Sequence, residues 1–423
     1  MSSPITADLP SERAAAWAGI ASPNGALLLL FFINLFNYID RQVLYALLPL
    51  IKAEFLVSDA RLGALASAFM LVYMCAAPPI GWLADRTRRT RWIAGGIAFW
   101  SVATCFSGLA RGYAQLFAAR AAVGIGESCY GSVSPSFVAE PFPAERRGRV
   151  LALFSMAIPV GSALGYVLGG WFGGRFGWRA AFFLLGLPGL LLAALALRLR
   201  DPRGEAGASR IPPTLREYAA LYRNPSYLAS TLAMAAMTFC LGGLAVWMPS
   251  FFNRYWGMDV ARAGTLFGAV TVAGGLVGSL LGGWLGDRLL KVTGKAYFLV
   301  SGTGLLLAMP FGIWSLCAGS LPLTLGALFL AETCAFLNMG PLNGVIVSVT
   351  APAVRSMAFA ANIFVIHALG DAVSPTLIGR ASDLWGLRAA LLGSMAFMGL
   401  AGAFCLWGAR SVETDSREAA RAA

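Results

Sequence analysis

Charged side chains are scarce in this sequence of 423 residues: Asp, Glu, Lys and Arg make up 12% of it, and 58% is hydrophobic. Soluble domains carry roughly 25% charged residues, so the composition argues against a water-soluble protein. The chain has one histidine and seven cysteines, and the cysteines form neither a CxxC pair nor a metal-ligand spacing. We therefore expect no metal site and interpret the cysteines as small packing residues.

Several functional patterns are also missing. No GxxxxGK[ST] motif is present, which disfavours an ATP-driven pump. We find no constellation of catalytic residues and expect neither an enzyme nor a bound cofactor. The alternating ~10-residue segments of a transmembrane β-barrel are absent. Residues 1–25 are polar and contain no short apolar run before a cleavage site, so we expect no signal peptide.

Hydrophobic residues instead come in long blocks that lack the polar face of a surface helix. A helix needs about 20 mostly apolar residues to span a bilayer. The chain contains twelve such stretches, which predict an all-α polytopic membrane protein with twelve transmembrane helices. The stretches lie at roughly 26–48, 61–83, 93–110, 114–138, 150–172, 179–198, 227–251, 262–286, 296–317, 321–349, 356–379 and 386–409.

Basic residues are distributed unevenly around these stretches. With the N-terminus assigned to the cytoplasm, 21 of the 32 Lys and Arg fall in cytoplasmic segments, nine outside and two within spans. This asymmetry is the positive-inside pattern of a cell-membrane protein (the inner membrane in a bacterium) with both termini in the cytoplasm. The net charge of +12 is therefore expected to meet membrane lipid headgroups and not nucleic acid.

The interior of the chain has one long hydrophilic stretch, at 199–226, which is rich in Pro, Gly and Arg. Such a composition is typical of a linker. We therefore predict a cytoplasmic tail, a six-helix bundle, a cytoplasmic linker, a second six-helix bundle and a second cytoplasmic tail. Their boundaries are 1–25, 26–198, 199–226, 227–409 and 410–423.

The two bundles resemble each other in sequence. GWLADR at 81–86 recurs as GWLGDR at 283–288, and GWRAA at 177–181 recurs as GLRAA at 386–390. Glu127-Ser-Cys and Glu332-Thr-Cys lie in the fourth helix of each half. Parallel repeats of six helices organise the major facilitator transporters. We therefore predict a major facilitator fold with two pseudo-symmetric bundles.

The segment GWLADRTRRTR at 81–91 resembles the superfamily signature between its second and third helices, although Arg88 stands where that pattern has a second glycine. The resemblance implies a latch that holds the cytoplasmic side shut. Its residues would be Asp85, Arg86 and Arg149 and, in the second half, Asp287 and Arg288. The alternative is that these charges only anchor the topology.

Longer segments resemble one branch of the superfamily, the spinster family of lipid-type transporters. They include NYIDR (37–41), RAAVGIGESCYGSVSP (120–135) and GDAVSPTLIGRASD (370–383). The resemblance implies transport of sphingosine-1-phosphate-like or lysophospholipid-like molecules, with proton coupling. It also implies that Asp40, Arg41, Arg120 and Glu127 are the family's charged cluster.

These four residues are unexpected on physical grounds, because an ionisable group in mid-bilayer costs at least ~2.5–3.5 kcal/mol. Asp40 and Arg41 are adjacent, so they point about 100° apart on a helix and are not simply each other's partners. Arg120 and Glu127 share a helix face. We interpret the four as a cavity lining and proton-coupling site; the alternative is a static charge network that orients the helices.

Further polar residues of the predicted spans are possible substrate contacts. On the first helix, Asn34 and Tyr38 continue the stripe of Arg41, and Asn37 lies beside Asp40. Those of the second half are Glu332, Asn338, His367 and Asp371. Histidine titrates near neutral pH, but a lone histidine is more often a hydrogen-bonded packing residue.

The sequence thus predicts a secondary active transporter that works by alternating access, is driven by a proton gradient and carries a small amphipathic lysolipid-like or sphingolipid-like molecule. We expect it to act as a monomer. One alternative is a drug or organic-anion antiporter of the same fold. A second, of another class, is an uncoupled lipid-conducting protein or a membrane receptor.

Overall fold

A computed structural model describes residues 22–201, 219, 221–351 and 354–421, and this part of the chain is helical and contains no strand. The helices of the first half are α2 (Pro23–Phe55), α3 (Asp59–Arg86), α4 (Arg89–Leu109), α5 (Tyr113–Gly131), α6 (Ser134–Ala139), α7 (Ala144–Ser155), α8 (Ala157–Phe176) and α9 (Trp178–Ala196).

The second half repeats this order. Its helices are α11 (Pro225–Trp256), α12 (Val260–Leu290), α13 (Ala296–Cys317), α14 (Leu321–Phe336), α15 (Met339–Val349), α16 (Arg355–Leu369), α17 (Ser374–Trp385), α18 (Leu387–Gly408) and a terminal α19 (Val412–Arg421). The predicted tail at 410–423 is thus mostly a helix, held in place where the Asp415 carboxylate accepts a hydrogen bond from the Ser226 amide at the start of α11. Most of the predicted linker and of the N-terminal tail lies outside the described residues.

Eleven spans of the described chain are long and apolar enough to cross a membrane. The stretch predicted at 114–138 forms α5 and α6, and α5 is less apolar because it carries Arg120 and Glu127. With α5 the fold has the twelve predicted transmembrane helices. Four of the twelve predicted stretches are interrupted, between α5 and α6, α7 and α8, α14 and α15, and α16 and α17, and we did not predict these breaks from the sequence.

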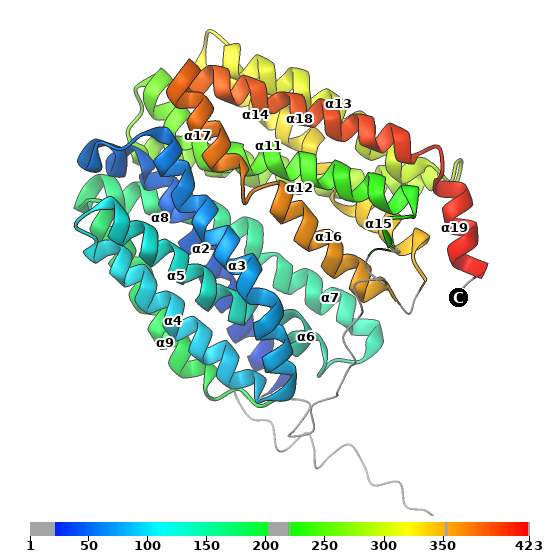
Figure 1. Ribbon diagram of the computed structural model, residues 1–423, viewed down its shortest axis with the longest axis horizontal. Coiled ribbons are helices and arrows are strands. Elements are labelled where there is room, and N and C mark those ends of the chain that lie inside the picture. The colour runs from blue at the N-terminus through cyan, green and yellow to red at the C-terminus, as the bar shows by residue number, and fades with distance from the viewer. Residues whose placement is uncertain (1–21, 202–218, 220, 352–353, 422–423) are drawn as a thin grey trace, which may run out of the picture.

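The two halves lean together at one end and separate toward the other (Figure 1). We call the first the closed end and the second, where α2 begins and α19 lies, the tail end. At the closed end α3 packs on α17 and α8 packs on α12. Backbones touch there at glycines: a Cβ on Gly63 would lie 2.1 Å from the Pro375 oxygen, and one on Gly264 would lie 2.4 Å from the Tyr166 oxygen.

Polar contacts strengthen the closed end. Both oxygens of the Asp59 carboxylate, at the start of α3, accept hydrogen bonds from Arg254 of α11 at 2.6 Å. Ser382 also donates to Asp59. In return, Asp383 accepts hydrogen bonds from the backbone amides of Asp59 and Ala60. Among the described residues, the hydrogen bonds and ion pairs that join the halves all lie at this end or near the middle, and none lies at the tail end.

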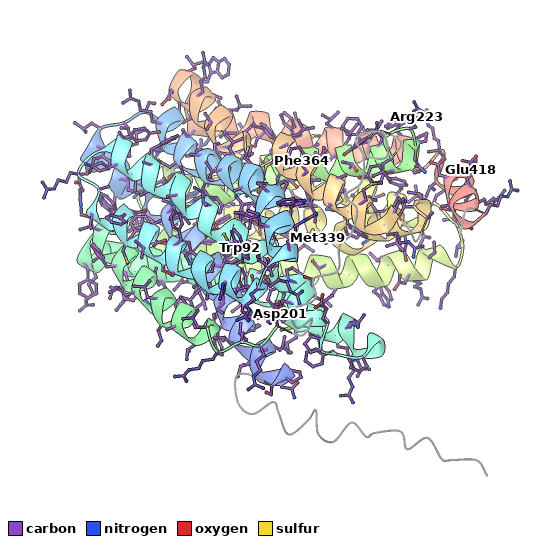
Figure 2. The ribbon with its side chains drawn as sticks, turned by 60° about the horizontal axis from the view of Figure 1, so that its bottom comes forward. Trp92, Asp201, Arg223, Met339, Phe364 and Glu418 are labelled. Carbon is purple, nitrogen blue, oxygen red and sulfur yellow. The ribbon has the colours of Figure 1, made fainter. Side chains whose placement is uncertain are left out.

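Both GWL(A/G)DR segments lie at the tail end, since α3 and α12 each begin at the closed end and run away from it. Arg223 and Glu418 lie together at this end of the second half, while Trp92 and Asp201 lie on the first half (Figure 2). The structure therefore places the two copies of the repeated signature on the same side, as the internal repeat predicts.

Small residues set the position of α2, which carries the predicted site. Gly161, Gly165 and Gly169 of α8 face α2. A Cβ on Gly161 would lie 2.6 Å from the Leu35 oxygen, and one on Gly165 would lie 2.6 Å from the Ile39 oxygen. The close contact of the two helices holds residues 34–41 in the interior of the first half.

Candidate functional site

Two ion pairs cross between α2 and α5 in the interior of the first half. Arg41 Nε donates to Glu127 Oε2 at 2.6 Å, and Arg120 Nη1 donates to Asp40 Oδ1 at 3.3 Å. The adjacent residues Asp40 and Arg41 thus each have a partner on the other helix. The structure brings together the four residues that the sequence analysis grouped.

This charge cluster, Asp40, Arg41, Arg120 and Glu127, is almost fully buried. The side chains of Glu127 and Arg120 are 0% and 1% exposed and that of Asp40 is 6% exposed, whereas that of Arg41 is 14% exposed. Burial of ion pairs is costly unless the remaining polar atoms are satisfied. Thr104 of α4 helps, because its hydroxyl donates to the second oxygen of Asp40.

Aromatic rings surround the Arg41 guanidinium. Its Cζ lies 4.9 Å from the ring centre of Tyr38, 5.0 Å from that of Phe69 and 5.2 Å from that of Tyr73. A cation is attracted to the face of an aromatic ring by up to ~2 kcal/mol when it is desolvated. The rings therefore offer Arg41 a favourable environment that does not depend on Glu127 alone.

Three polar atoms of this region have no partner among the described residues: Glu127 Oε1, Arg120 Nε and Asn37 Nδ2. Most buried polar groups in proteins are hydrogen-bonded, and exceptions call for an explanation. The nearby Asn34 is satisfied, because its amide nitrogen donates to the Phe154 oxygen at 3.1 Å. The cluster thus has unused capacity to bind a proton, a water molecule or a ligand.

The predicted polar residues of the second half form separate groups. Glu332 of α14 is buried; one of its oxygens accepts a hydrogen bond from Thr271 of α12 at 3.1 Å, and the other has no partner among the described residues. Asn338, at the break between α14 and α15, is buried and donates to the sulfur of Met237. No hydrogen bond in the described chain joins either residue to the charge cluster.

His367 and Asp371 lie together at the break between α16 and α17. His367 Nδ1 and Asp371 Oδ1 are 2.8 Å apart, and the two side chains are 28% and 22% exposed. Tyr45 of α2 lies within electrostatic reach of Asp371 and of Arg41 and Glu127. The pair therefore belongs to the same central region as the charge cluster, on the other half.

The predicted gate residues whose side chains the structure describes form no hydrogen bond or ion pair between the halves. Arg86 lies 4.0 Å from the ring centre of Trp82 in its own helix, and Arg288 stacks on Trp284 in the same way. Asp287 accepts a hydrogen bond from Tyr297 of its own half, and Arg149 is exposed. The side chain of Asp85 is outside the described part, so its role in a latch remains a prediction.

Comparison with known proteins bears on the identity of this helix bundle. Residues 30–375 match the family described as Major Facilitator Superfamily. The human protein spinster homolog 1 is 36% identical, in an alignment that covers 95% of this chain and 84% of the human one. The Drosophila melanogaster protein spinster is 34% identical over 84% of this chain and 61% of its own.

The chain belongs to the spinster family of the major facilitator superfamily. A crystal structure of a bacterial homologue of the human lysosomal transporter spinster, in an inward-facing and unoccupied conformation, superposes with a TM-score of 0.83. That alignment covers 93% of this chain and 98% of the other, at 24% identity, and so shows the common fold. The protein is accordingly a multi-pass membrane transporter of this family.

Several residues that shape the site of this spinster-family transporter were missed by sequence reasoning. Thr104 and Tyr73 lie on helices without an obvious polar pattern, and only their positions opposite α2 connect them to the cluster. At the tail end, the buried Arg89 forms ion pairs with Glu140 at 2.7 Å and with Asp201. Sequence reasoning counted Arg89 only as one of several basic residues, although its place in the signature segment was a usable signal.

Proposed function

We propose that this spinster-family protein is a proton-coupled transporter that works by alternating access and carries an amphipathic lysolipid-like or sphingolipid-like molecule. The observation that carries the proposal is the unequal burial of one ion pair. Arg41 is partly exposed, whereas its partner Glu127 is completely buried and has one free oxygen. A substrate that enters from the tail end could therefore reach the arginine before it reached the glutamate.

This arrangement supports an exchange of partners. A phosphate or other anionic headgroup would compete with Glu127 for the guanidinium of Arg41, and Arg forms strong paired hydrogen bonds with such groups. A carboxylate that loses its cation in a buried site is more stable when protonated. Substrate binding and proton binding would then be linked through Arg41, and we propose Asp40 with Arg120 as the second pair of the same mechanism.

Exposed apolar side chains of the second half suit the other end of an amphipathic molecule. Met339 and Phe364, on the interrupted helices of the second half, are 38% and 52% exposed (Figure 2). An apolar tail that packed on such side chains would gain about 25 cal/mol of favourable free energy for each Å² of apolar surface that leaves water. We propose that Tyr38, His367 and Asp371 contact the part of the substrate that lies between its headgroup and its tail. The buried polar residues behind them would be Asn34, Asn37, Glu332 and Asn338.

Uptake by proteoliposomes tests the coupling, with a labelled lysophospholipid or sphingoid phosphate as substrate and with or without an imposed pH gradient. Glu127→Gln keeps the shape of the side chain but cannot lose a proton, so we expect binding to persist and stimulation by the gradient to disappear. Glu418→Gln changes an exposed glutamate of α19 and should behave like the wild type.

Equal stimulation of the wild type and Glu127→Gln by the gradient would remove Glu127 as the coupling group. Absence of stimulation in the wild type, together with retained counterflow, would indicate an uncoupled carrier. Transport of organic anions or drugs in place of lysolipids would favour the antiporter of the same fold.

A further inference from the structure

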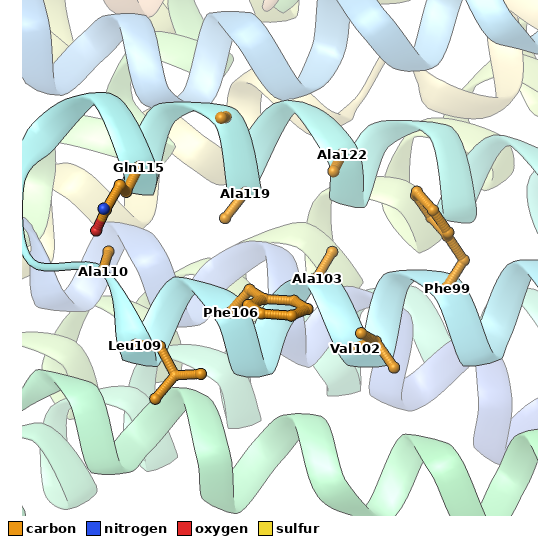
Figure 3. Close-up of a pocket in the computed structure, with 10 residues that line it drawn as sticks. Phe99, Val102, Ala103, Phe106, Leu109, Ala110, Gln115, Ala119 and Ala122 are labelled. Atoms are coloured by element: carbon orange, nitrogen blue, oxygen red, sulfur yellow. The ribbon is translucent and has the colours of Figure 1, made fainter.

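The outer face of the first half carries an apolar seam between α4 and α5 that the proposed transport mechanism does not use. A groove of about 560 Å³ lies along the closed-end half of this seam (Figure 3). A second groove of about 500 Å³ continues it toward the tail end, and Phe99 lines both. The two grooves together follow nearly the whole length of α4.

The seam is hollow because the two helices touch through glycines on one side and are rimmed by large side chains on the other. A Cβ on Gly96 would lie 2.7 Å from the Gly126 oxygen, so the backbones are in contact there. Phe99, Phe106 and Ile125 are 47%, 58% and 41% exposed and form the rim. In the closed-end groove, Ala119 and Ala122 of α5 face Phe99 and Phe106 of α4 (Figure 3).

The groove nearer the tail end has the length of one lipid chain. Along α4 its lining runs from Arg91 to Phe99, which is about 12 Å at 1.5 Å per residue, and Thr87 extends it beyond the start of the helix. The hydrocarbon core of one leaflet is about 15 Å thick, half of the ~30 Å of a bilayer. An acyl chain that lay along this groove would therefore end near Phe99, at the middle of the membrane.

Charge at the mouth of this groove is positive. Arg91 is the one charged residue among those that line the two grooves, and it is exposed and has no acidic partner in the described chain. The side chain of the neighbouring Arg89 is instead buried and forms ion pairs with Glu140 and Asp201. Trp92 also lines the mouth, and tryptophan is enriched at membrane interfaces.

We propose that the tail-end groove between α4 and α5 binds one anionic phospholipid of the adjacent leaflet, with an acyl chain along the seam to Phe99 and the phosphate on Arg91. The lipid is a bound component of the membrane-facing surface and not the transported substrate. It fills the groove that the touching helices leave open and thereby supports the face of α5 opposite Glu127 and Arg120. The proposal does not depend on which molecule is transported.

Native mass spectrometry and thermal unfolding test this site on detergent-purified full-length protein with added dioleoyl phosphatidylglycerol or dioleoyl phosphatidylcholine. We expect the wild type to retain phosphatidylglycerol in preference to phosphatidylcholine. Arg91→Gln should weaken phosphatidylglycerol binding about fivefold, the effect of one basic residue at a charged lipid surface, and leave phosphatidylcholine unchanged. Gly95→Leu should weaken the binding of both, because a Cβ there enters open space that lines the groove.

Two matched variants separate this site from general effects. Arg111→Gln removes an exposed arginine at the other end of the same helix pair, and Gly326→Leu adds a side chain to an equally open, exposed glycine of α14. Both should bind lipid like the wild type. Equal loss in Arg91→Gln and Arg111→Gln, or unchanged lipid binding in Gly95→Leu with its thermal unfolding intact, would overturn the proposal.

Discussion

At the scale of single residues, the charge cluster explains how four ionisable groups remain in the interior of a membrane bundle. Each cation has a carboxylate partner on the facing helix, and Arg41 has aromatic rings as well. An incomplete pair would be far less stable than a complete one, because a buried charge without a partner costs several kcal/mol. The sites of the cluster are therefore energetically coupled in pairs.

This coupling can be measured for Asp40 and Arg120. We expect Arg120→Leu alone to lower the free energy of unfolding by about 3–5 kcal/mol, because it leaves Asp40 buried without its cation. The double variant Asp40→Leu/Arg120→Leu should recover a large part of this loss. Thermal unfolding of the wild type, both single variants and the double variant in the same detergent gives the coupling, and strictly additive losses would contradict it.

The composition of the cluster could be predicted from sequence, but its pairing could not. Adjacent helical residues diverge by about 100°, which was sufficient to separate Asp40 from Arg41. The choice of Glu127 for Arg41, and of Arg120 for Asp40, depends on the rotation of α5 relative to α2. That rotation is set by close contacts of several helices, such as Gly124 of α5 with the Phe69 backbone, which a single sequence does not reveal.

At the scale of helices, close packing of α2 on α8 holds the site in place. The three glycines of α8 lie four residues apart and present their backbone to α2. The sequence showed this small-residue face, and it also held a signal for the break after Ser155 that we did not use. Pro159, in the first turn of α8, has no backbone N–H to donate to the Ser155 carbonyl, so the helix is interrupted there.

Two alanine substitutions in the same helix test the packing of α8. Gly165→Ala places a Cβ 2.6 Å from the Ile39 oxygen, so α2 must move. We expect a lower melting temperature and slower transport, since Asp40 and Arg41 move with α2. Gly174→Ala, whose Cβ would meet the nearest atom at 3.6 Å, is the control and should be close to the wild type. Equal effects of the two would show that the helix contact is not the determinant.

At the scale of the whole molecule, the closed end holds the halves together and the tail end leaves them apart (Figure 1). The internal repeat and the hydrophobic stretches were sufficient to predict two six-helix bundles. They could not predict which end is closed, because under the proposed alternating access one sequence encodes the contacts of both conformations. For this reason we could not identify Asp59 and Arg254 from the sequence as residues that join the halves.

The closed end should open when the carboxylate of Asp59 is removed. Asp59→Asn replaces the carboxylate with a neutral amide that cannot form an ion pair with Arg254. We therefore expect a longer and broader distribution of distances between spin labels at Ala114 and Leu384, which lie on the two halves at this end. Asp259→Asn is the control, because Asp259 caps α12 through Arg262 within one half. Identical distributions for Asp59→Asn and the wild type would argue against Asp59 as a fastening residue.

Under the proposed proton coupling, the membrane potential would act differently on the two protonation states of the charge cluster. With both carboxylates ionised, Asp40, Arg41, Arg120 and Glu127 carry no net charge, and all four belong to one half of the protein. Movement of that half then transfers no charge from these groups across the electric field. Addition of one proton makes the cluster +1, and displacement of one charge through 100 mV corresponds to about 2.3 kcal/mol. The voltage would thus favour one direction of movement for the protonated carrier and neither direction for the unprotonated one.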